Sequence, residues 1–516
     1  MLIRITTKKK VAKKNTAIFL YVIISIMDDN IKKPEENQTP STPTFETVPI
    51  EENLQPEELP PEVASPSSEE ITQSGPEIPP ETPPIYEENK NKYFIIGGAA
   101  LVLLFFLVII VKVFFSPKKQ SQQVKLTYWG LWEEKEVFDP LIKQYQKSNP
   151  QIVIDYQKMA PDDYKNRLVA RSAKGLGPDI FRYHNTWLPE IKDVVSLLPD
   201  QVMTASEFEK TFYKIHQQDL KVGNHYYGLP LTIDGLVLIY NDNLLKKAGI
   251  NNPPSNWDEI TDMVTKLTVK DATGQIITAG IALGTANNVE HFSDIFGLML
   301  VQNGGDFKAL DQSEAAGALE SYRKFAEPPN DFWNESMPNS IAAFIQEKVA
   351  MIIAPSWEVL AIKAGNPDLA VKVVSVPSVP GGKAVSLASY WVEGVSRYSK
   401  NQLEAWKFLK FLVEKDSLTK LYQIESQLRP FGEAYSRVDL ASLLIQNPYL
   451  GAVIKQADYF VSLPLSSRTF DNGLNDEIIK YLENAVNATS QGVSYSQALV
   501  TAKQGVDQVF SKYGIK

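Results

Sequence analysis

Hydrophobic and polar positions follow two alternating periods along the chain from residue 124 onward. Residues 124–128 alternate strictly between apolar and polar, which predicts a strand. Apolar side chains then recur at helical spacing over residues 137–145, and strict alternation returns over 152–156. A strand, a helix and a second strand in this order predict a β-α-β unit with parallel strands.

The alternation of elements continues through the middle of the chain. Residues 162–173 predict a helix, and a strand follows at 179–183. Residues 236–240 are an unbroken apolar run, of the kind that a parallel sheet buries on both faces. Strand and helix alternate up to residue 376, and helical patterns dominate from residue 402 to the end.

Two helix boundaries in this region carry capping signals. The helix predicted at 241–247 is followed by Gly249, a residue type that readily ends helices in the left-handed conformation. Ser255, with Asp258 three positions later, has the spacing of a capping box and predicts the start of another helix.

The part of the chain from residue 124 to residue 516 is too long for one comfortable hydrophobic core. Its repeated alternation of strand and helix assigns it to the α/β fold class. We therefore expect two α/β lobes with a cleft between them, because clefts between domains are preferred sites for ligands.

The first 123 residues form segments of a different kind. Residues 1–27 are basic and then apolar, like the beginning of a signal peptide, but no small-residue cleavage site follows, and Met27 is an alternative start. Residues 28–92 are rich in Pro and Glu, which predicts a disordered acidic tail. Residues 93–115 are apolar for long enough to predict one transmembrane helix, and 116–123 form a short tether.

Charge and cysteine content exclude several classes of protein. The formal net charge is −9, and the acidic excess lies mainly in the tail at 28–92. The remainder lacks the clustered Lys and Arg of a nucleic-acid surface, so we expect no nucleic-acid partner. The chain has no cysteine, which excludes disulfides, thiol catalysis and a lipid anchor on cysteine. Membrane attachment would therefore depend on the 93–115 helix.

The usual catalytic motifs are missing from the sequence. The four histidines do not stand in a metal-ligand spacing, and neither a GxSxG elbow nor a phosphate-binding loop is present. We therefore expect no enzyme activity, no catalytic residue, no bound metal and no cofactor. Two alternatives stay open: Glu133 and Glu134 as a glycosidase pair, and a structural cation near residues 271–274.

Aromatic and polar residues gather where the predicted strands end. They are Trp129, Trp132, Tyr183, His184, Asn185 and Trp187. Open α/β sheets bind ligands outside the carboxyl ends of their strands. Flat rings beside polar groups suit a sugar, because the C–H face of the sugar packs on a ring while its hydroxyl groups form hydrogen bonds. Trp406, on a helical apolar stripe, is assigned to the core instead.

Five segments carry a resemblance to a known family. In chain order they are VKLTYWGLWEE, GPDIFRYHNTWLPEI, YGLPLTIDGLVLIYNDNLLKKAGINNPPSNWDEI, FIQEKVAMIIAPSW and EAWKFLKFLVEKD. From residue 124 to the end the chain resembles the extracytoplasmic solute-binding proteins of ABC importers, in the carbohydrate-binding group that includes the maltose-binding protein.

The resemblance implies a two-lobed clamp like that of the type II periplasmic binding proteins. It is expected to act as a monomer that closes on its solute and delivers it to the permease subunits of an importer. The first lobe would hold about 124–232 and 384–425, and the second about 235–380 and 430–516. Hinges are then expected near 232–235, 380–383 and 425–430.

The resemblance also implies a set of ligand-binding residues. The first lobe would supply Trp129, Trp132, Glu133, Glu134, Tyr183, His184, Asn185 and Trp187. The second lobe would supply Asp234, Glu290, Phe292 and Trp357, with Tyr390 and Trp391 closing the site. Arg429 is either a hydrogen-bond donor to the ligand or part of a salt bridge. Thr186 and Trp187 replace an Asp-Arg pair of the maltose-binding protein, and Glu134 replaces a lysine, so a maltose preference is not carried over.

Topology follows from this function, because a solute scavenger must face outward. The protein is expected at the cell membrane with a single span, an extracytoplasmic binding domain and a cytoplasmic tail. Two alternatives stay open. One is a membrane-tethered sensor, and the other is a binding protein for a cationic solute such as a polyamine, which acidic candidates such as Glu133 and Glu290 would suit. The density of aromatic residues favours a sugar.

Overall fold

The computed structural model describes residues 103–105, 107 and 123–515, and separates the unit Ser121–Lys516 from the unit Met1–Gln120. The extension predicted at 1–27, the tail at 28–92 and most of the tether lie outside the described residues. Of the span predicted at 93–115, only Leu103, Leu104, Phe105 and Leu107 are described, and they are helical. Within the described parts, the helices are too short or too polar for any of them to cross a membrane.

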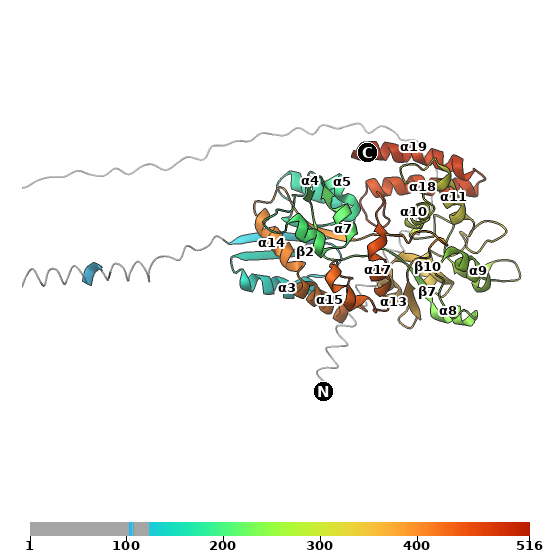
Figure 1. Ribbon diagram of the computed structural model, residues 1–516, viewed down its shortest axis with the longest axis horizontal. Coiled ribbons are helices and arrows are strands. Elements are labelled where there is room, and N and C mark those ends of the chain that lie inside the picture. The colour runs from blue at the N-terminus through green and yellow to red at the C-terminus, as the bar shows by residue number, and fades with distance from the viewer. Residues whose placement is uncertain (1–102, 106, 108–122, 516) are drawn as a thin grey trace, which may run out of the picture. The chain divides into compact units, whose positions relative to one another are not determined.

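The first lobe is built on a five-stranded sheet (Figure 1). Its strand order is β2 (Ile152–Lys158), β1 (Val124–Gly130), β3 (Ile180–His184), β13 (Trp391–Val395) and β6 (Leu229–Pro230). The helix α3 (Lys135–Ser148) connects β1 to β2, which run parallel, so the predicted β-α-β opening is confirmed. The apolar face of α3, including Phe138 and Leu141, is buried.

The second lobe contains another five-stranded sheet. Its order is β11 (Val371–Val374), β7 (Leu236–Asn241), β10 (Val349–Pro355), β9 (Ile276–Ile281) and β8 (Val269–Lys270). Every residue of β7 is buried, as its apolar sequence predicted. The parallel pairing was wrong, however, because β7 runs antiparallel to both β10 and β11. A central strand is covered on both faces in either direction, so its apolar pattern cannot distinguish the two.

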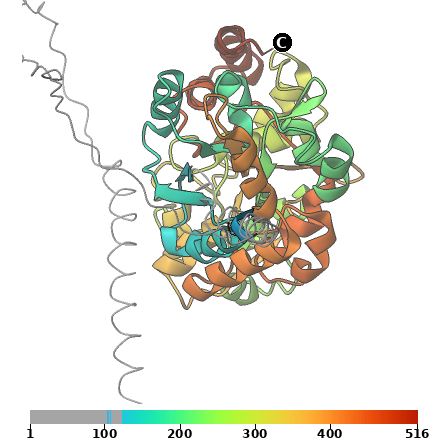
Figure 2. The same ribbon diagram turned by 90° about the vertical axis from the view of Figure 1, so that its left-hand side faces the viewer.

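Helices cover both sheets. Around the first sheet lie α4 (Tyr164–Ala173), α5 (Leu188–Ile191), α6 (Ala205–Thr211), α7 (Lys214–Asp219), α14 (Gln402–Leu412) and α15 (Lys415–Leu428). Around the second lie α8 (Asp242–Lys247), α9 (Trp257–Leu267), α10 (Phe292–Gln302), α11 (Ser313–Arg323), α12 (Ser340–Ile345) and α13 (Glu358–Gly365). Figure 2 shows the teal helix α3 beside the orange helices of the 402–428 segment, and α15 packs directly on α3.

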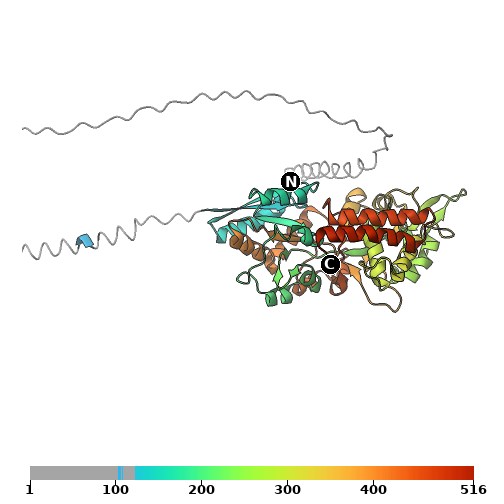
Figure 3. The ribbon, with the colours of Figure 1, turned by 90° about the horizontal axis from the view of Figure 1, so that it is seen from above.

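The C-terminal helices extend the second lobe. After α16 (Ala441–Leu444) and α17 (Gly451–Gln456), the helices α18 (Leu474–Ser490) and α19 (Tyr495–Tyr513) lie side by side in Figure 3. The helix α18 packs on α10, and α19 packs on α11. The segment that leads into α18 is therefore attached to the second lobe at its C-terminal end.

Within residues 123–515 the chain crosses between the two sheets three times. The first crossing, 231–235, joins β6 to β7, the second joins β11 to β13, and the third follows α15. Thr232 pairs with Tyr435, and Gly235 pairs with Ala388, so the three crossings lie side by side. A Cβ atom on Gly235 would lie 2.2 Å from the Leu387 carbonyl oxygen, which explains the glycine. Ala388 and Tyr435 lie a few residues beyond the hinges expected at 380–383 and 425–430, and the lobe boundaries stay a prediction.

The two capping signals had different outcomes. Gly249 has a φ of +75° and directly follows Ala248, the C-cap of α8, as predicted for a helix end. The start of α9 differs by one residue, because Asn256 is the N-cap and its side chain accepts from the Glu259 N–H. The Glu259 carboxylate in turn accepts from the N–H of Ser255 at 2.7 Å. The long Glu259 side chain, rather than that of Asp258, completes the cap.

Candidate functional site

A cluster of aromatic rings centred on Trp391 lies where β1 and β3 end. Trp391 begins β13 and pairs with His184, the last residue of β3. The centroid of its ring lies 5.1 Å from that of His184, 5.3 Å from Trp132 and 5.4 Å from Trp187, all edge to face. Trp132 and Trp391 are only partly buried, so both present ring surface at this edge. The structure thus brings four of the predicted ligand residues together.

Three predicted aromatic residues are packed in the core of the first lobe. Trp129, Tyr183 and Trp187 are buried. The Trp129 ring lies 6.3 Å from the Tyr164 ring and 5.9 Å from the Arg171 guanidinium group. Trp187 supports the Trp391 ring from within the lobe. Direct contact of these three residues with a ligand stays a prediction.

Asn185 and Tyr390 converge on a carboxylate that the sequence did not single out. The Tyr390 hydroxyl donates to Oδ2 of Asp219 at 2.8 Å, and Nδ2 of Asn185 donates to the same oxygen at 3.0 Å. Ser462 adds a third hydrogen bond at 2.7 Å. Burial raises the pKa of Asp219 to about 6, against the opposing effect of these hydrogen bonds. Asp219 thereby positions two predicted ligand residues.

The neighbouring acids Glu133 and Glu134 have different surroundings. Glu133 is buried and forms an ion pair with Arg182, which also donates through Nε to Glu393 at 2.6 Å. Burial opposes ionisation of Glu133, yet Arg182 and then Arg429 hold its pKa below the usual range. Glu134 is exposed and pairs with Lys158 at 2.9 Å. The Glu133 carboxylate therefore has its partner in the interior of the protein, whereas the Glu134 carboxylate lies at the surface.

Arg429 extends the buried ion pairs toward the third crossing. Its guanidinium group lies 3.1 Å from Glu425 and 3.6 Å from Glu433, which corresponds to the salt-bridge alternative. Carboxylate oxygens of Glu133, Glu425 and Glu433 lie within 4.8 Å of one another, a grouping that is unique among the described residues. Because two guanidinium groups already supply positive charge here, we assign the cluster as an ion-pair network rather than a metal centre.

Trp357 is the predicted ligand residue that the second lobe exposes most clearly. Its side chain is 37% exposed, and its ring lies 5.8 Å from that of His291. The Asp234 carboxylate accepts from the backbone N–H groups of Ser356 and Trp357, both at 3.2 Å. Burial raises the pKa of Asp234 to about 6, although these hydrogen bonds oppose the shift. Asp234 thus ties the first crossing to the start of α13.

The other predicted residues of the second lobe are Glu290 and Phe292. Glu290 forms an ion pair with Nε of Arg468 at 3.0 Å and also accepts from Asn339. Phe292 is buried in the first turn of α10. Glu290 is therefore neutralised within the protein, and a role for Phe292 in ligand contact stays a prediction.

Sequence reasoning missed the segment 462–476, which leads into α18 and includes its first three residues. It reaches the second lobe through Ser467, which lies 2.7 Å from Nδ1 of His291. It reaches the first lobe through Asn475, which donates to Thr186 at 2.9 Å, and through Phe470, whose ring lies 6.1 Å from that of Trp132. An aromatic residue in a turn-rich stretch, SSRTFDNG, was the available signal. Trp132, in contrast, was singled out because it follows a predicted strand.

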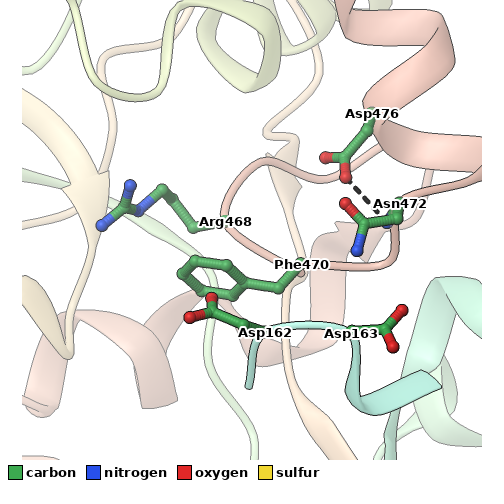
Figure 4. A pocket seen from close by; sticks show the side chains of 6 residues that line it. All are labelled: Asp162, Asp163, Arg468, Phe470, Asn472 and Asp476. Atoms are coloured by element: carbon green, nitrogen blue, oxygen red, sulfur yellow. Dashed lines mark hydrogen bonds between the residues drawn. The ribbon is translucent and has the colours of Figure 1, made fainter. Parts of the chain in front are cut away.

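A hollow of about 430 Å³ opens beside this loop (Figure 4). It is lined by Asp162, Asp163, Arg468, Phe470, Asn472 and Asp476. In Figure 4 the Phe470 side chain lies in the middle of the lining, between Arg468 and the segment with Asp162 and Asp163. The hollow therefore adjoins the predicted site through Phe470, which faces Trp132, and through Arg468, which binds Glu290.

Comparisons with known proteins identify the family of this chain. Residues 130–418 match the family of bacterial extracellular solute-binding proteins. A binding protein of Brucella abortus is 26% identical over 316 residues, which are 58% of this chain and 74% of that protein. The maltotriose-binding protein of Pyrococcus abyssi is 22% identical over 353 residues, or 62% of this chain and 72% of that protein.

Solved structures show the same fold. The solute-binding protein of Thermotoga lettingae, bound with α-D-tagatose, aligns with a TM-score of 0.60 at 23% identity. The alignment covers 75% of this chain and 99% of that one. The expectation of a two-lobed α/β fold is thereby confirmed. Since the family match spans more than half of the sequence, the chain belongs to the bacterial extracellular solute-binding proteins, in the group similar to the maltose-binding protein.

Proposed function

We propose that this protein captures a carbohydrate between its two lobes and delivers it to the permease of an ABC importer. The observation that carries the proposal is the aromatic row formed by Trp391, Trp132 and Phe470, whose ring centroids lie 5.3 Å and 6.1 Å apart in turn. Partly exposed rings in a row offer apolar faces to the C–H surfaces of sugar units. Binding rather than catalysis is the role that this arrangement serves.

The pairing of the acidic residues supports a neutral solute over a cationic one. Glu133 is paired with Arg182, Glu134 with Lys158, and Glu290 with Arg468. Asp234 accepts hydrogen bonds from backbone N–H groups. At these four positions a polyamine would have to break an existing pair or hydrogen bond to gain a counter-ion, whereas a sugar can bind without disturbing them.

Lobe closure is the proposed mechanism of capture. The three crossings lie side by side, and the first sheet and the second sheet are separate. Trp132 and Trp357 belong to opposite lobes, so a ligand that touches both stabilises the closed arrangement. A ligand shifts such an equilibrium only by its difference in affinity for the two states, and a change from 1% to 99% closed needs about 5.5 kcal/mol.

The membrane anchor is a further part of the proposal. Residues 93–115 would form an uncleaved helix that holds the binding domain outside the cell and leaves the tail at 28–92 in the cytoplasm. Protease added to intact cells should then digest the binding domain and spare the tail. Digestion of the tail with protection of the binding domain would contradict this topology.

A ligand screen tests the proposed function. Thermal unfolding of the full chain should be measured with monosaccharides, oligosaccharides, polyamines and short peptides, and each positive confirmed by calorimetry. A ligand at one hundred times its Kd stabilises the folded state by about 2.7 kcal/mol. We expect such a shift with at least one neutral sugar. Stabilisation by polyamines or peptides alone would overturn the proposal.

A further inference from the structure

We propose that the hollow beside Phe470 is an outer subsite that binds an additional sugar unit without acidic groups, so that the ligand is an oligosaccharide. This inference rests on the proposed function and specifies its substrate class. The hollow measures about 430 Å³. That volume lies within the range of about 300–1,000 Å³ that ligand pockets occupy.

The hollow continues the row of aromatic rings. Phe470 lines it and lies 6.1 Å from Trp132, whose ring lies 5.3 Å from Trp391. Successive sugar units can stack on successive rings, because each ring offers an apolar face. A chain bound on Trp391 and Trp132 would therefore extend past Phe470 into the hollow.

The backbone around the hollow is held in a costly conformation. Among the described residues, six residues other than glycine have a positive φ, and four of them line this hollow. They are Asp163 (56°), Arg468 (60°), Phe470 (56°) and Asn472 (48°). Such strained backbone is found preferentially at binding sites. For a bulky residue such as Phe470 a positive φ is a genuine outlier.

Buried polar contacts keep Phe470 in this conformation. The next residue, Asp471, is buried, and its carboxylate accepts from the backbone N–H groups of Gly473 at 3.2 Å and Asn475 at 2.9 Å. The Asn475 side chain bridges from Asp471 to Thr186 of the first lobe, at 2.9 Å in both cases. The loop is thus fixed from behind, and the Phe470 ring is left to face the hollow.

The charges of the lining select against an acidic ligand. Asp162 and Asp163 are exposed at the rim, and Asp476 lies at the start of α18. The single guanidinium group, that of Arg468, is already paired with Glu290. Carboxylates accept hydrogen bonds from sugar hydroxyl groups but repel a uronate, sulfate or phosphate. Of a neutral and an acidic sugar unit, the neutral one is therefore the occupant that fits.

The first test compares ligand lengths by calorimetry on the full chain. The probes are glucose, mannose and xylose with the matching trimers maltotriose, cellotriose, mannotriose and xylotriose. The best trimer should bind at least tenfold more tightly than its monosaccharide. Phe470→Ala should lower the trimer affinity at least tenfold and the monosaccharide affinity less than threefold. Phe332→Ala, which removes a half-buried ring outside the hollow, is the matched control and should change neither.

The second test concerns charge. Trigalacturonate should bind the wild-type chain far more weakly than a neutral trimer. A double variant with Asp162→Asn and Asp163→Asn should reduce the ratio of the two affinities, neutral trimer over trigalacturonate, at least fivefold. Asparagine tolerates the positive φ of Asp163, so the loop should keep its shape. Asp193→Asn, at an exposed carboxylate elsewhere in the first lobe, should leave the difference unchanged.

The outcomes separate this inference from the function on which it rests. If the wild-type chain binds no sugar of any length, the proposed function fails. If monosaccharides and trimers bind equally well, or Phe470→Ala weakens both to the same degree, the subsite is overturned while the proposed function stands. Preferential binding of trigalacturonate would also overturn it.

Discussion

Trp132 and Glu133 follow each other in the chain, yet their side chains enter opposite kinds of environment. The Trp132 ring is partly exposed between Trp391 and Phe470. The Glu133 carboxylate is buried against Arg182, in a network that reaches the third crossing. One residue faces the candidate site while its neighbour fixes the loop from within. Rigid support behind an exposed ring limits the entropy that a binding loop loses on contact with its ligand.

The second lobe repeats this division between an exposed ring and a buried acid. Trp357 is exposed, and the Asp234 carboxylate holds its backbone N–H group at 3.2 Å. The support differs in kind, because Asp234 receives neutral N–H donors while Glu133 pairs with a guanidinium group. Both lobes therefore place a buried acid behind an exposed ring, but the partners of the two acids differ. The two lobes should respond differently to mutation and to pH.

Arg182→Ala should have the largest effect. It leaves the carboxylates of Glu133 and Glu393 buried without their common partner. Removing one member of a buried ion pair typically costs about 3–5 kcal/mol. Urea denaturation should show this loss in the free energy of unfolding.

An exposed ion pair provides the control for Arg182. Arg397 lies 3.8 Å from Asp193 at the surface, so Arg397→Ala should cost less than about 1 kcal/mol. Equal losses in the two variants would mean that the network does not support the Trp132 loop. If Arg182→Ala fails to fold, Glu393→Gln removes one charge of the network with little change in shape.

Trp357→Ala should come next, with its effect on binding rather than on stability. Removal of a central aromatic anchor typically weakens binding by at least about 2 kcal/mol, or roughly thirtyfold. Calorimetry with the sugar identified in the screen measures this change. Tyr398→Ala removes another exposed ring and should leave the affinity unchanged. Unaltered affinity in a folded Trp357→Ala protein would remove Trp357 from the site.

The division between exposed rings and buried acids was largely not predictable from the sequence, although the α/β fold class was. Local periods identified β1, α3 and β2, because each element has its own spacing of apolar positions. The antiparallel pairing of β7 and the pairing of β13 with β3 depend on contacts between distant segments. Local periodicity does not contain such contacts.

The same limit applies to the candidate site. Two adjacent glutamates look alike in the sequence, and only the position of Arg182 on β3 decides that Glu133 is buried while Glu134 is exposed. Trp132 was found because it is an aromatic residue near a predicted strand end, and Trp391 was found through the family resemblance. Phe470 was missed because its loop precedes a helix, far along the chain from both.

A pH titration tests the buried network of the first lobe through a smaller effect on the free energy of unfolding. Burial, then the neighbouring Glu133 and Glu425, raise the pKa of Glu433 well above its usual value. The folded state then keeps a proton that the unfolded chain releases near pH ~4.3, so the free energy of unfolding falls as pH rises from there through the folded pKa. Glu433→Gln should flatten this fall, measured by denaturation at several pH values. Parallel wild-type and variant curves would contradict the raised pKa.

Glu134→Gln should have the smallest effect. The pair of Glu134 with Lys158 is exposed to solvent, so its loss should change stability by at most about 1 kcal/mol. Denaturation in low and high salt measures this, and the small difference should vanish in high salt. A loss as large as that of Arg182→Ala would remove the contrast between the two neighbouring acids.

The hollow between Asp162 and Phe470 has a practical consequence, because the chain contains no cysteine. A thiol introduced by Asp162→Cys would be the only one in the protein, and it would stand at an exposed rim without a strained backbone. A polarity-sensitive dye on this thiol would change its emission when a solute fills the hollow. The protein would then serve as its own optical sensor, and the fractions of a crude mixture that contain the solute could be found by the change in emission.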